Sequence, residues 1–307
     1  MDPTCVNRKP KIIDDVITTN NMHNICDLLK ESRLIARNTL LDELAPNSEL
    51  HRAVIYHLSA PGSEARAAIC LSAGMALGLE TNAAVRLAAA VETLHNASLI
   101  QDDLQDQDEF RRNKPAIWKI FGRDMAINAT DLFLANAFQL VVSARADSAL
   151  ELVTAMNRAI ANTLQGQTKD LNIDHKLCID EAIAIAKEKS GPFFSLSLQL
   201  PLILGGQSKF LSIASEAGAS FGVGYQIFDD LHDRKLDRKC KSMSNMALLI
   251  EDNVDSDVSV PQNTAEDLAY QFLNHAASKA DALPNECGKL LVNKCFELLR
   301  LLDREAA

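Results

Sequence analysis

The segment from Ala83 to Leu104 constrains the fold most, because it is long and apolar. Val91, His95, Ser98 and Asp102 recur along it at helical spacing. Residues three and four apart share one face of an α-helix, so the spacing predicts a helix with one continuous stripe. The stripe runs from apolar residues to a carboxylate, and the carboxyl end of this helix is therefore the first candidate functional site.

Two acidic triads with the same spacing follow apolar segments of the chain. They occupy positions i, i+1 and i+4: Asp102, Asp103 and Asp106 in the first, and Asp229, Asp230 and Asp233 in the second. On a helix such residues lie close together, and three carboxylates in one patch repel each other unless a cation neutralises them. The pair of triads predicts two halves of one metal site. The alternative is two solvated acidic helix ends.

The rest of the chain predicts an all-α fold. Only 12 of 307 residues are glycine, alanine and leucine are plentiful, and no stretch alternates like a strand. Helices are expected over about 21–44, 49–58, 64–78, 83–104, 124–145, 149–171, 181–205 (with a bend at 191–192), 208–233, 264–280 and 285–303. We expect one helical domain over 21–307, a weakly ordered lead-in over 1–20, and a surface lid loop over 234–262, partly helical near 246–249.

Charge and composition exclude several classes of protein. The net charge of −10 argues against a nucleic-acid-binding protein. The first residues contain no apolar signal core, and no stretch approaches the ~18 apolar residues of a membrane span. The seven cysteines are scattered and odd in number, which is typical of reduced thiols. A cytoplasmic protein without a transmembrane segment is expected.

The acidic triads suit a hard cation, because neither contains the soft ligands that other metals prefer. Mg²⁺ takes oxygen ligands and is usually completed by substrate phosphates. Two triads could bind several Mg²⁺ ions around a diphosphate and make it a leaving group. Loss of diphosphate from an allylic carbon leaves a carbocation, which needs a dry apolar pocket. The sequence therefore indicates chemistry on a prenyl diphosphate.

Five ordered motifs resemble those of the trans-isoprenyl (polyprenyl) diphosphate synthases. They are DDLQD at 102–106, RRNKP at 111–115, GQTKDL at 166–171, KS at 189–190 and GYQIFDDLHD at 224–233. The resemblance implies an isoprenoid synthase bundle around a central apolar cavity. It also implies three Mg²⁺ ions bound with the substrate diphosphate, a homodimer, and the substrates isopentenyl diphosphate and an allylic prenyl diphosphate.

The resemblance also implies a role for each matching residue. The Mg²⁺ ligands would be Asp102, Asp103, Asp106, Asp229 and Asp230, supported by Asp233. The allylic diphosphate would bind Arg111, Lys189 and a lid lysine such as Lys239 or Lys241. The diphosphate of isopentenyl diphosphate would bind Arg66, His95 and Arg112, and the reacting centre would be lined by Ser190 and Gln226. Without the motif order, the simpler interpretations would be preferred: a charged loop for Arg111 and Arg112, a solvated charge for Lys189, a core residue for His95 and a buried polar contact for Gln226.

The chain departs from the family pattern near Arg66. A lysine is expected where Ser63 stands, and the acid Glu64 follows it. Losing one charge-assisted contact to a diphosphate, worth roughly 1.5–3 kcal/mol, would weaken binding. Two alternatives therefore stay open. One is a terpene-synthase-like enzyme that ionises an allylic diphosphate without isopentenyl diphosphate, and the other is a non-catalytic regulatory subunit of a prenyl synthase.

Two small residues bear on product length. Ala97 and Ser98 precede Asp102 where bulky aromatics stop chain growth in short-product members of the family. Small side chains there imply a deeper pocket and a product of C20 or longer, of the geranylgeranyl type. This expectation holds unless Phe133 or Phe138 on the next helix restores a floor.

Overall fold

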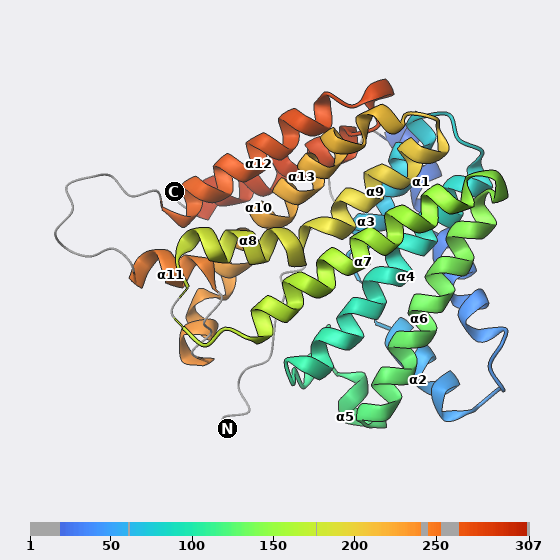
Figure 1. Ribbon diagram of the computed structural model, residues 1–307, viewed down its shortest axis with the longest axis horizontal. Coiled ribbons are helices and arrows are strands. Elements are labelled where there is room, and N and C mark those ends of the chain that lie inside the picture. Colours follow the sequence, from blue (N-terminus) through green and yellow to red (C-terminus); the bar gives the residue numbers. More distant parts are fainter. Residues whose placement is uncertain (1–18, 61, 176, 241–244, 253–263, 306–307) are drawn as a thin grey trace. The chain divides into compact units, whose positions relative to one another are not determined.

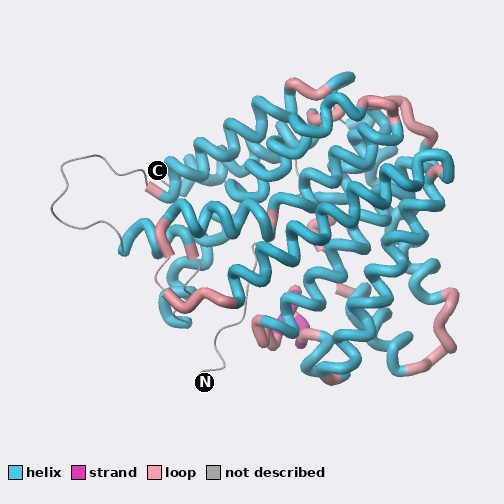
Figure 2. The backbone as a smooth tube through the Cα atoms, viewed as in Figure 1, coloured by secondary structure: helices cyan, strands magenta, loops and turns pink. Residues whose placement is uncertain are grey.

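The computed structural model describes residues 19–60, 62–175, 177–240, 245–252 and 264–305. The predicted lead-in over 1–20 lies outside these residues, except for the start of the first helix. Within the described residues the protein is all-α, as predicted, with thirteen α-helices and one two-stranded hairpin (Figures 1 and 2). It divides into two compact units, one of residues 1–154 with 203–206 and one of 155–202 with 207–307. The prediction of one domain over 21–307 stays a prediction.

Unit 1 is organised around the helix predicted at 83–104. Its elements are α1 (Thr19–Leu41), α2 (Glu49–Leu58), α3 (Ala65–Ala76), α4 (Thr81–Gln105), β1 (Phe110–Arg111), β2 (Lys114–Pro115), α5 (Ile117–Phe121), α6 (Arg123–Ala144) and the start of α7 (Ala149–Leu171). Helices α1, α3 and α6 pack against α4. The apolar residues of α4 from Ala83 to Leu104 are buried, except the half-buried Leu99, which accounts for the long apolar segment.

Unit 2 is organised around the helix of the second triad. It contains most of α7, then α8 (Ile179–Lys189), α9 (Gly191–Leu204), α10 (Leu211–Cys240), α11 (Met246–Asp252), α12 (Ala265–Asp281) and α13 (Lys289–Glu305). Helices α8, α11 and α12 pack against α10, and α13 packs against α12. Gly222 lets α10 approach Gly191 closely, because a Cβ at Gly222 would lie 2.7 Å from the Gly191 nitrogen. That approach sets the position of Ser190 beside α10.

Two sequence expectations about local structure are corrected. The charged loop at 105–116 contains a two-stranded hairpin, in which Arg111 pairs with Lys114. The helix expected over 181–205 is two helices, because α8 ends at Lys189 and α9 begins at Gly191. The turn of the hairpin falls on Arg112 and Asn113, whose φ angles of 53° and 63° lie in the left-handed region that asparagine tolerates.

Within the lid predicted over 234–262, the helix expected near 246–249 is confirmed, but the described residues do not form a surface loop. Residues 234–240 continue α10, and residues 246–252 form α11. Met246 to Ile250 are buried, because five consecutive apolar side chains leave no face of the short helix for water. Residues 241–244 and 253–263 lie outside the described residues, so the lid function stays a prediction.

Helix α6 corrects the expectation that no segment could span a membrane. Among the described residues it alone is long and apolar enough, with a mean hydropathy of 1.4 in its most apolar window. Of that window, 44% is buried within the protein. A core helix of this composition passes the same test, and α6 packs against α4.

Candidate functional site

The first acidic triad lies at the carboxyl end of α4. Helix α4 ends at Gln105, and the backbone N–H of Asp106 donates to the carbonyl oxygen of Asp102 at 2.8 Å. Asp102 is half-buried and Asp106 is exposed, but Asp103 is only 2% exposed. Consecutive helical residues point about 100° apart, so Asp103 turns into the protein while Asp102 faces outward.

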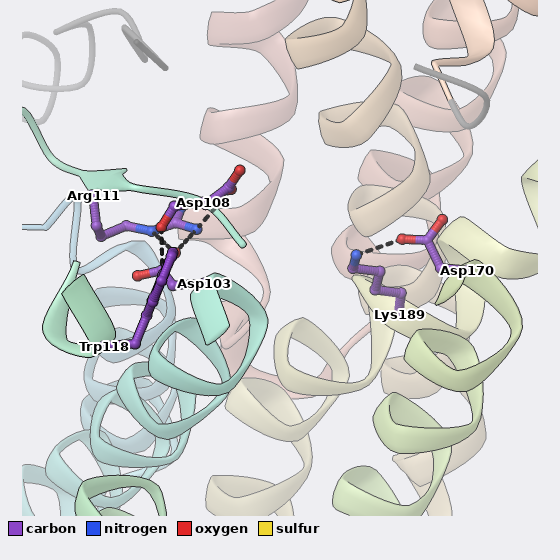
Figure 3. Close-up of polar contacts among 6 residues, drawn as sticks. All are labelled: Asp103, Asp108, Arg111, Trp118, Asp170 and Lys189. Carbon is purple, nitrogen blue, oxygen red and sulfur yellow. Dashed lines mark hydrogen bonds and ion pairs between the residues drawn. The ribbon is translucent and has the colours of Figure 1, made fainter. Parts of the chain in front are cut away.

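Asp103 forms a buried ion pair with Arg111 of the hairpin (Figure 3). The Arg111 Nε donates to Asp103 Oδ1 at 2.7 Å, and its Nη2 donates to the same oxygen. Burial disfavours the charge on Arg111, but the carboxylate outweighs burial and raises the pKa of the guanidinium. Burial raises the pKa of Asp103 to about 6, against the opposing effect of Arg111. The contact joins two motifs that the sequence presented separately.

Arg112, in the turn of the same hairpin, contacts Ala60 and Asn96. Its Nη1 donates to the carbonyl oxygen of Ala60 at 2.9 Å, and its Nη2 lies 3.4 Å from Asn96 Oδ1. Burial lowers the pKa of Arg112. One pocket of unit 1 brings both arginines together with Asp103 and a third cation. Its lining is Tyr56, His57, Ala60, Asp103, Arg111, Arg112, Lys114, Pro115, Ala116 and Ile117.

His57, which the sequence did not single out, is a buried neutral histidine. Its Nε2 donates to Asn96 Oδ1 at 2.9 Å, since the Asn96 amide itself donates to the carbonyl oxygen of Glu92. Its ring packs edge-on against Phe133. Burial, with the nearby Arg112 charge, lowers the pKa of His57 to about 3. The imidazole therefore stays uncharged at neutral pH.

His57 is expected to make the protein less stable in mild acid. The folded-state pKa of about 3 lies below the ordinary value of 6.5, so the unfolded chain binds the proton first. The contribution of neutral His57 to the free energy of unfolding is complete above pH 6.5. It is lost as the pH falls toward 3, by up to about 1.4 kcal/mol per pH unit. The measurement is the free energy of unfolding between pH 7 and about pH 5, in wild type and in His57→Gln, which keeps a donor for Asn96. If the free energy of unfolding depended on pH equally in the two proteins, His57 would not be the source of the acid sensitivity.

Arg66 and His95, which the resemblance assigns to the same diphosphate, contact each other. The Arg66 Nη1 lies 3.0 Å from His95 Nε2. Glu92, one turn before His95 on α4, faces the same group. Burial raises the pKa of Glu92, and Arg66 opposes that effect. The sequence predicted the two basic residues but not this acid.

Glu64, the departure from the family pattern, is held by an arginine that the sequence did not single out. Arg33 of α1 donates from Nε to Glu64 Oε1 at 2.7 Å and from Nη2 to Oε2 at 2.6 Å. Glu64 precedes α3 with a φ of 48°, a left-handed conformation unusual for glutamate. The two-point ion pair offsets the negative charge that the sequence placed near Arg66.

Ala97 and Ser98 lie on the apolar part of α4. Ala97 is 1% exposed and belongs to a core cluster that includes Phe133, which is fully buried. The Ser98 hydroxyl donates to the carbonyl oxygen of His95 at 2.9 Å. Of the two rings that could restore a floor to the pocket, Phe133 is therefore the relevant one. It lies in the same core cluster as Ala97, whereas Phe138 is half-buried.

In unit 2, the second triad divides in the same way as the first. Asp229 and Asp233 are half-buried, whereas Asp230 is 5% exposed. Both carboxylate oxygens of Asp230 accept hydrogen bonds at 2.8 Å, Oδ1 from Gln226 Nε2 and Oδ2 from the backbone N–H of Met246. Gln226 also lies 3.4 Å from the Ser190 hydroxyl through its Oε1, so the structure brings three predicted residues together.

Lys189 pairs with an acid from another predicted motif. Its Nζ lies 2.6 Å from Asp170 Oδ2, so the GQTKDL and KS motifs meet between α7 and α8 (Figure 3). A second pair beside it joins Lys169 to Glu188 at 2.6 Å. The side chain of Lys239 and all of Lys241, the suggested lid lysines, lie outside the described residues.

The described residues contain no preformed cluster of metal ligands. No three histidine, cysteine, aspartate or glutamate side chains among them gather closely enough to bind a metal ion. The expectation that each triad forms a single carboxylate patch is wrong, because Asp103 and Asp230 turn inward to protein donors. The donor set still fits Mg²⁺, which uses one or two carboxylates and completes its shell with water and phosphate oxygens.

Comparisons with known proteins agree with the five motifs. Residues 47–267 match the model of the polyprenyl synthetase family. The chain belongs to the polyprenyl synthetase family. Membership confirms the predicted family and the predicted enzyme class, a trans-prenyltransferase. The matched residues include all five motifs.

Individual relatives agree on the family and differ in product. The chain is 30% identical to a geranylgeranyl pyrophosphate synthase of Geoglobus acetivorans over 68% of each chain. It is 31% identical to a farnesyl diphosphate synthase of Geobacillus stearothermophilus over 66% of this chain and 72% of the other. The crystal structure of geranylgeranyl pyrophosphate synthetase from Pyrococcus horikoshii has a TM-score of 0.78 at 23% identity, covering 91% of this chain and 98% of that one. The last comparison shows the isoprenoid synthase fold.

Proposed function

We propose that the protein is a Mg²⁺-dependent prenyltransferase that makes a polyprenyl diphosphate of C20 or longer from an allylic diphosphate and isopentenyl diphosphate. The observation that carries the proposal is that, in each unit, a buried aspartate of the acidic triad contacts another residue of the family motifs. Asp103 contacts Arg111 in unit 1, and Asp230 contacts Gln226 in unit 2. The family joins these two substrates, and its named relatives make C15 and C20 products.

The aspartates divide into two groups in the proposed mechanism. Asp102 and Asp106, with Asp229 and Asp233, would offer carboxylate oxygens to Mg²⁺, which neutralises the diphosphate and makes it a better leaving group. The buried Asp103 and Asp230 would support these ligands through the hydrogen bonds that they accept from protein donors. We propose that each triad contributes to the binding of Mg²⁺ and substrate diphosphate, with the three Mg²⁺ ions that the resemblance implies.

The basic residues would bind the two diphosphates. Arg111 and Lys189 would hold the allylic diphosphate, and Arg66, His95 and Arg112 would hold that of isopentenyl diphosphate. The allylic C–O bond breaks and its electron pair leaves with the diphosphate. The double bond of isopentenyl diphosphate then forms the new C–C bond, and a proton leaves the neighbouring carbon. Ser190 and Gln226 would line the reacting centre.

One observation favours a second candidate. Ser63 is exposed and Glu64 is bound by Arg33, so the acceptor end lacks one expected positive charge. An enzyme that ionises an allylic diphosphate without isopentenyl diphosphate would not need that charge. A regulatory subunit, the third possibility, would not need either acidic triad.

One incubation separates these candidates. Purified protein is supplied with Mg²⁺ and C10, C15 or C20 allylic diphosphates, with and without isopentenyl diphosphate, and both phases are analysed. We expect prenyl diphosphates of C20 or longer, formed only with isopentenyl diphosphate. Hydrocarbon or alcohol without it would support the second candidate, and no turnover would support the third. A C15 end product would contradict the proposed length and would point to Phe133 as the floor.

Location and assembly are proposed from the same resemblance. We propose a cytoplasmic homodimer. Its support within the structure is that Ile127 and Val142 on α6 are 50% and 41% exposed, which leaves apolar surface on a helix whose other face packs on α4.

A further inference from the structure

Asp230 is hydrogen-bonded to the start of α11 at two points. Its Oδ2 accepts the backbone N–H of Met246, the first residue of α11, at 2.8 Å. Its backbone carbonyl oxygen accepts from Asn245 Nδ2 at 3.0 Å. One aspartate of the second motif is therefore bound to α11 through both its side chain and its main chain.

Asn245 connects this aspartate to the start of the short helix. While its Nδ2 donates to Asp230, its Oδ1 accepts the backbone N–H of Leu248 at 3.0 Å, as an N-cap residue does. Asn245 is 2% exposed, and both ends of its amide are used. A buried amide satisfied at both ends fixes its neighbours in one arrangement, because turning it would leave donors and acceptors unpaired.

The far end of α11 is bound to the same helix. Glu251 accepts from Arg234 at 2.7 Å and also from Arg238, both on α10. Between the two ends, Met246 to Ile250 are buried. Helix α11 is thus held to α10 at its beginning, along its apolar face and at its end.

We infer that Asn245 is a positioning residue of the second aspartate-rich motif. It clamps α11 onto Asp230, and this clamp fixes the turn of α10 from which Asp229 and Asp233 project. The inference rests on the proposed function, in which those two carboxylates bind Mg²⁺. Asp230 serves mainly as the anchor of α11, and Asn245 acts on the metal through it.

Asn245→Asp tests the clamp while keeping the helix cap. The aspartate retains an acceptor for the Leu248 N–H but cannot donate to the Asp230 carbonyl, and it places a second carboxylate there. The matched control is Asn274→Asp, because the exposed Asn274 likewise donates from Nδ2 to a helical carbonyl, that of Tyr270, at 2.9 Å. Asn245→Ser, which keeps a shorter cap, serves if the aspartate variant does not fold.

The first readout is the dependence of turnover on Mg²⁺. In Asn245→Asp we expect the half-saturating Mg²⁺ concentration to rise about tenfold, with the KM for isopentenyl diphosphate within about twofold of wild type. A merely structural role would lower activity without moving the Mg²⁺ dependence. An unchanged Mg²⁺ curve in a folded variant would overturn the inference, and so would an equal shift in the Asn274 control.

The second readout does not depend on activity. Amide hydrogen exchange at Met246 and Leu248 reports whether α11 stays clamped, and we expect exchange at Met246 to accelerate at least about tenfold in Asn245→Asp. Unchanged exchange would overturn the clamp even in an active enzyme. Faster exchange in a protein whose wild type has no turnover would instead mean that the proposed function is wrong while the clamp is right.

Discussion

Replacing Asp102 by alanine is expected to lower kcat at least about a thousandfold, and Asp229→Ala is expected to do the same. Each variant removes a half-buried carboxylate that would otherwise bind the Mg²⁺ of the substrate diphosphate. Without it, negative charge on the departing diphosphate is less well neutralised just when it grows. The measurement is steady-state turnover of an allylic diphosphate with isopentenyl diphosphate at saturating Mg²⁺.

The choice of these two aspartates follows from the difference within each triad. Asp103→Ala would leave the guanidinium of Arg111 buried without its carboxylate, which typically destabilises a protein by about 3–5 kcal/mol. Lost activity in that variant would not distinguish chemistry from unfolding. Asp102 and Asp229 are more exposed, so their removal should leave the melting temperature nearly unchanged.

Matched controls come from exposed aspartates on the same kind of element. Asp131 lies on the exposed side of α6 in unit 1, and Asp281 ends α12 in unit 2. Alanine at either position should leave turnover within about twofold of wild type, since surface substitutions rarely matter. Near-normal activity in Asp102→Ala or Asp229→Ala would remove the metal assignment of that triad.

Periodicity and short-range signals determined what the sequence could predict. The bounds of α2 and α7 agree with the expected helices, and α4 carries the first triad at its end as its apolar stripe indicated. Such features depend on residues that are neighbours in the chain. Helix α11 was expected near 246–249, but its charged surroundings placed it in a surface lid, whereas Met246 to Ile250 are buried.

Contacts between distant residues explain what the sequence missed. Arg33 lies 31 residues before Glu64, and Asn245 lies 15 residues after Asp230. Nothing in the local pattern marks either residue, because the pairing exists only once the helices pack. The inward turn of Asp103 is similar: its spacing was readable, but the burial that sends it to Arg111 depends on the hairpin.

Ser63→Lys is expected to lower the KM for isopentenyl diphosphate about tenfold or more. It restores the positive charge that the family pattern expects beside Arg66. A charge-assisted hydrogen bond to a diphosphate is worth about 1.5–3 kcal/mol, which corresponds to roughly ten- to a hundredfold in affinity. Ser63 is exposed, so a longer side chain fits without displacing the core. The matched control is Ser208→Lys, which adds the same charge at an exposed position in unit 2.

Arg33→Ala should change the same constant in the opposite direction. Arg33 now neutralises Glu64 through two hydrogen bonds of 2.6 and 2.7 Å, and its removal leaves that carboxylate near Arg66. We expect the KM for isopentenyl diphosphate to rise about three- to tenfold, with the KM for the allylic diphosphate unchanged, because a partly exposed charge is screened by water. Arg33→Ala with Glu64→Gln should return this KM toward the wild-type value, since no charge is then left to neutralise.

If Ser63→Lys and Arg33→Ala both leave the KM for isopentenyl diphosphate unchanged, residues 63 and 64 do not face the acceptor diphosphate. The departure from the family pattern would then carry no argument for a different acceptor.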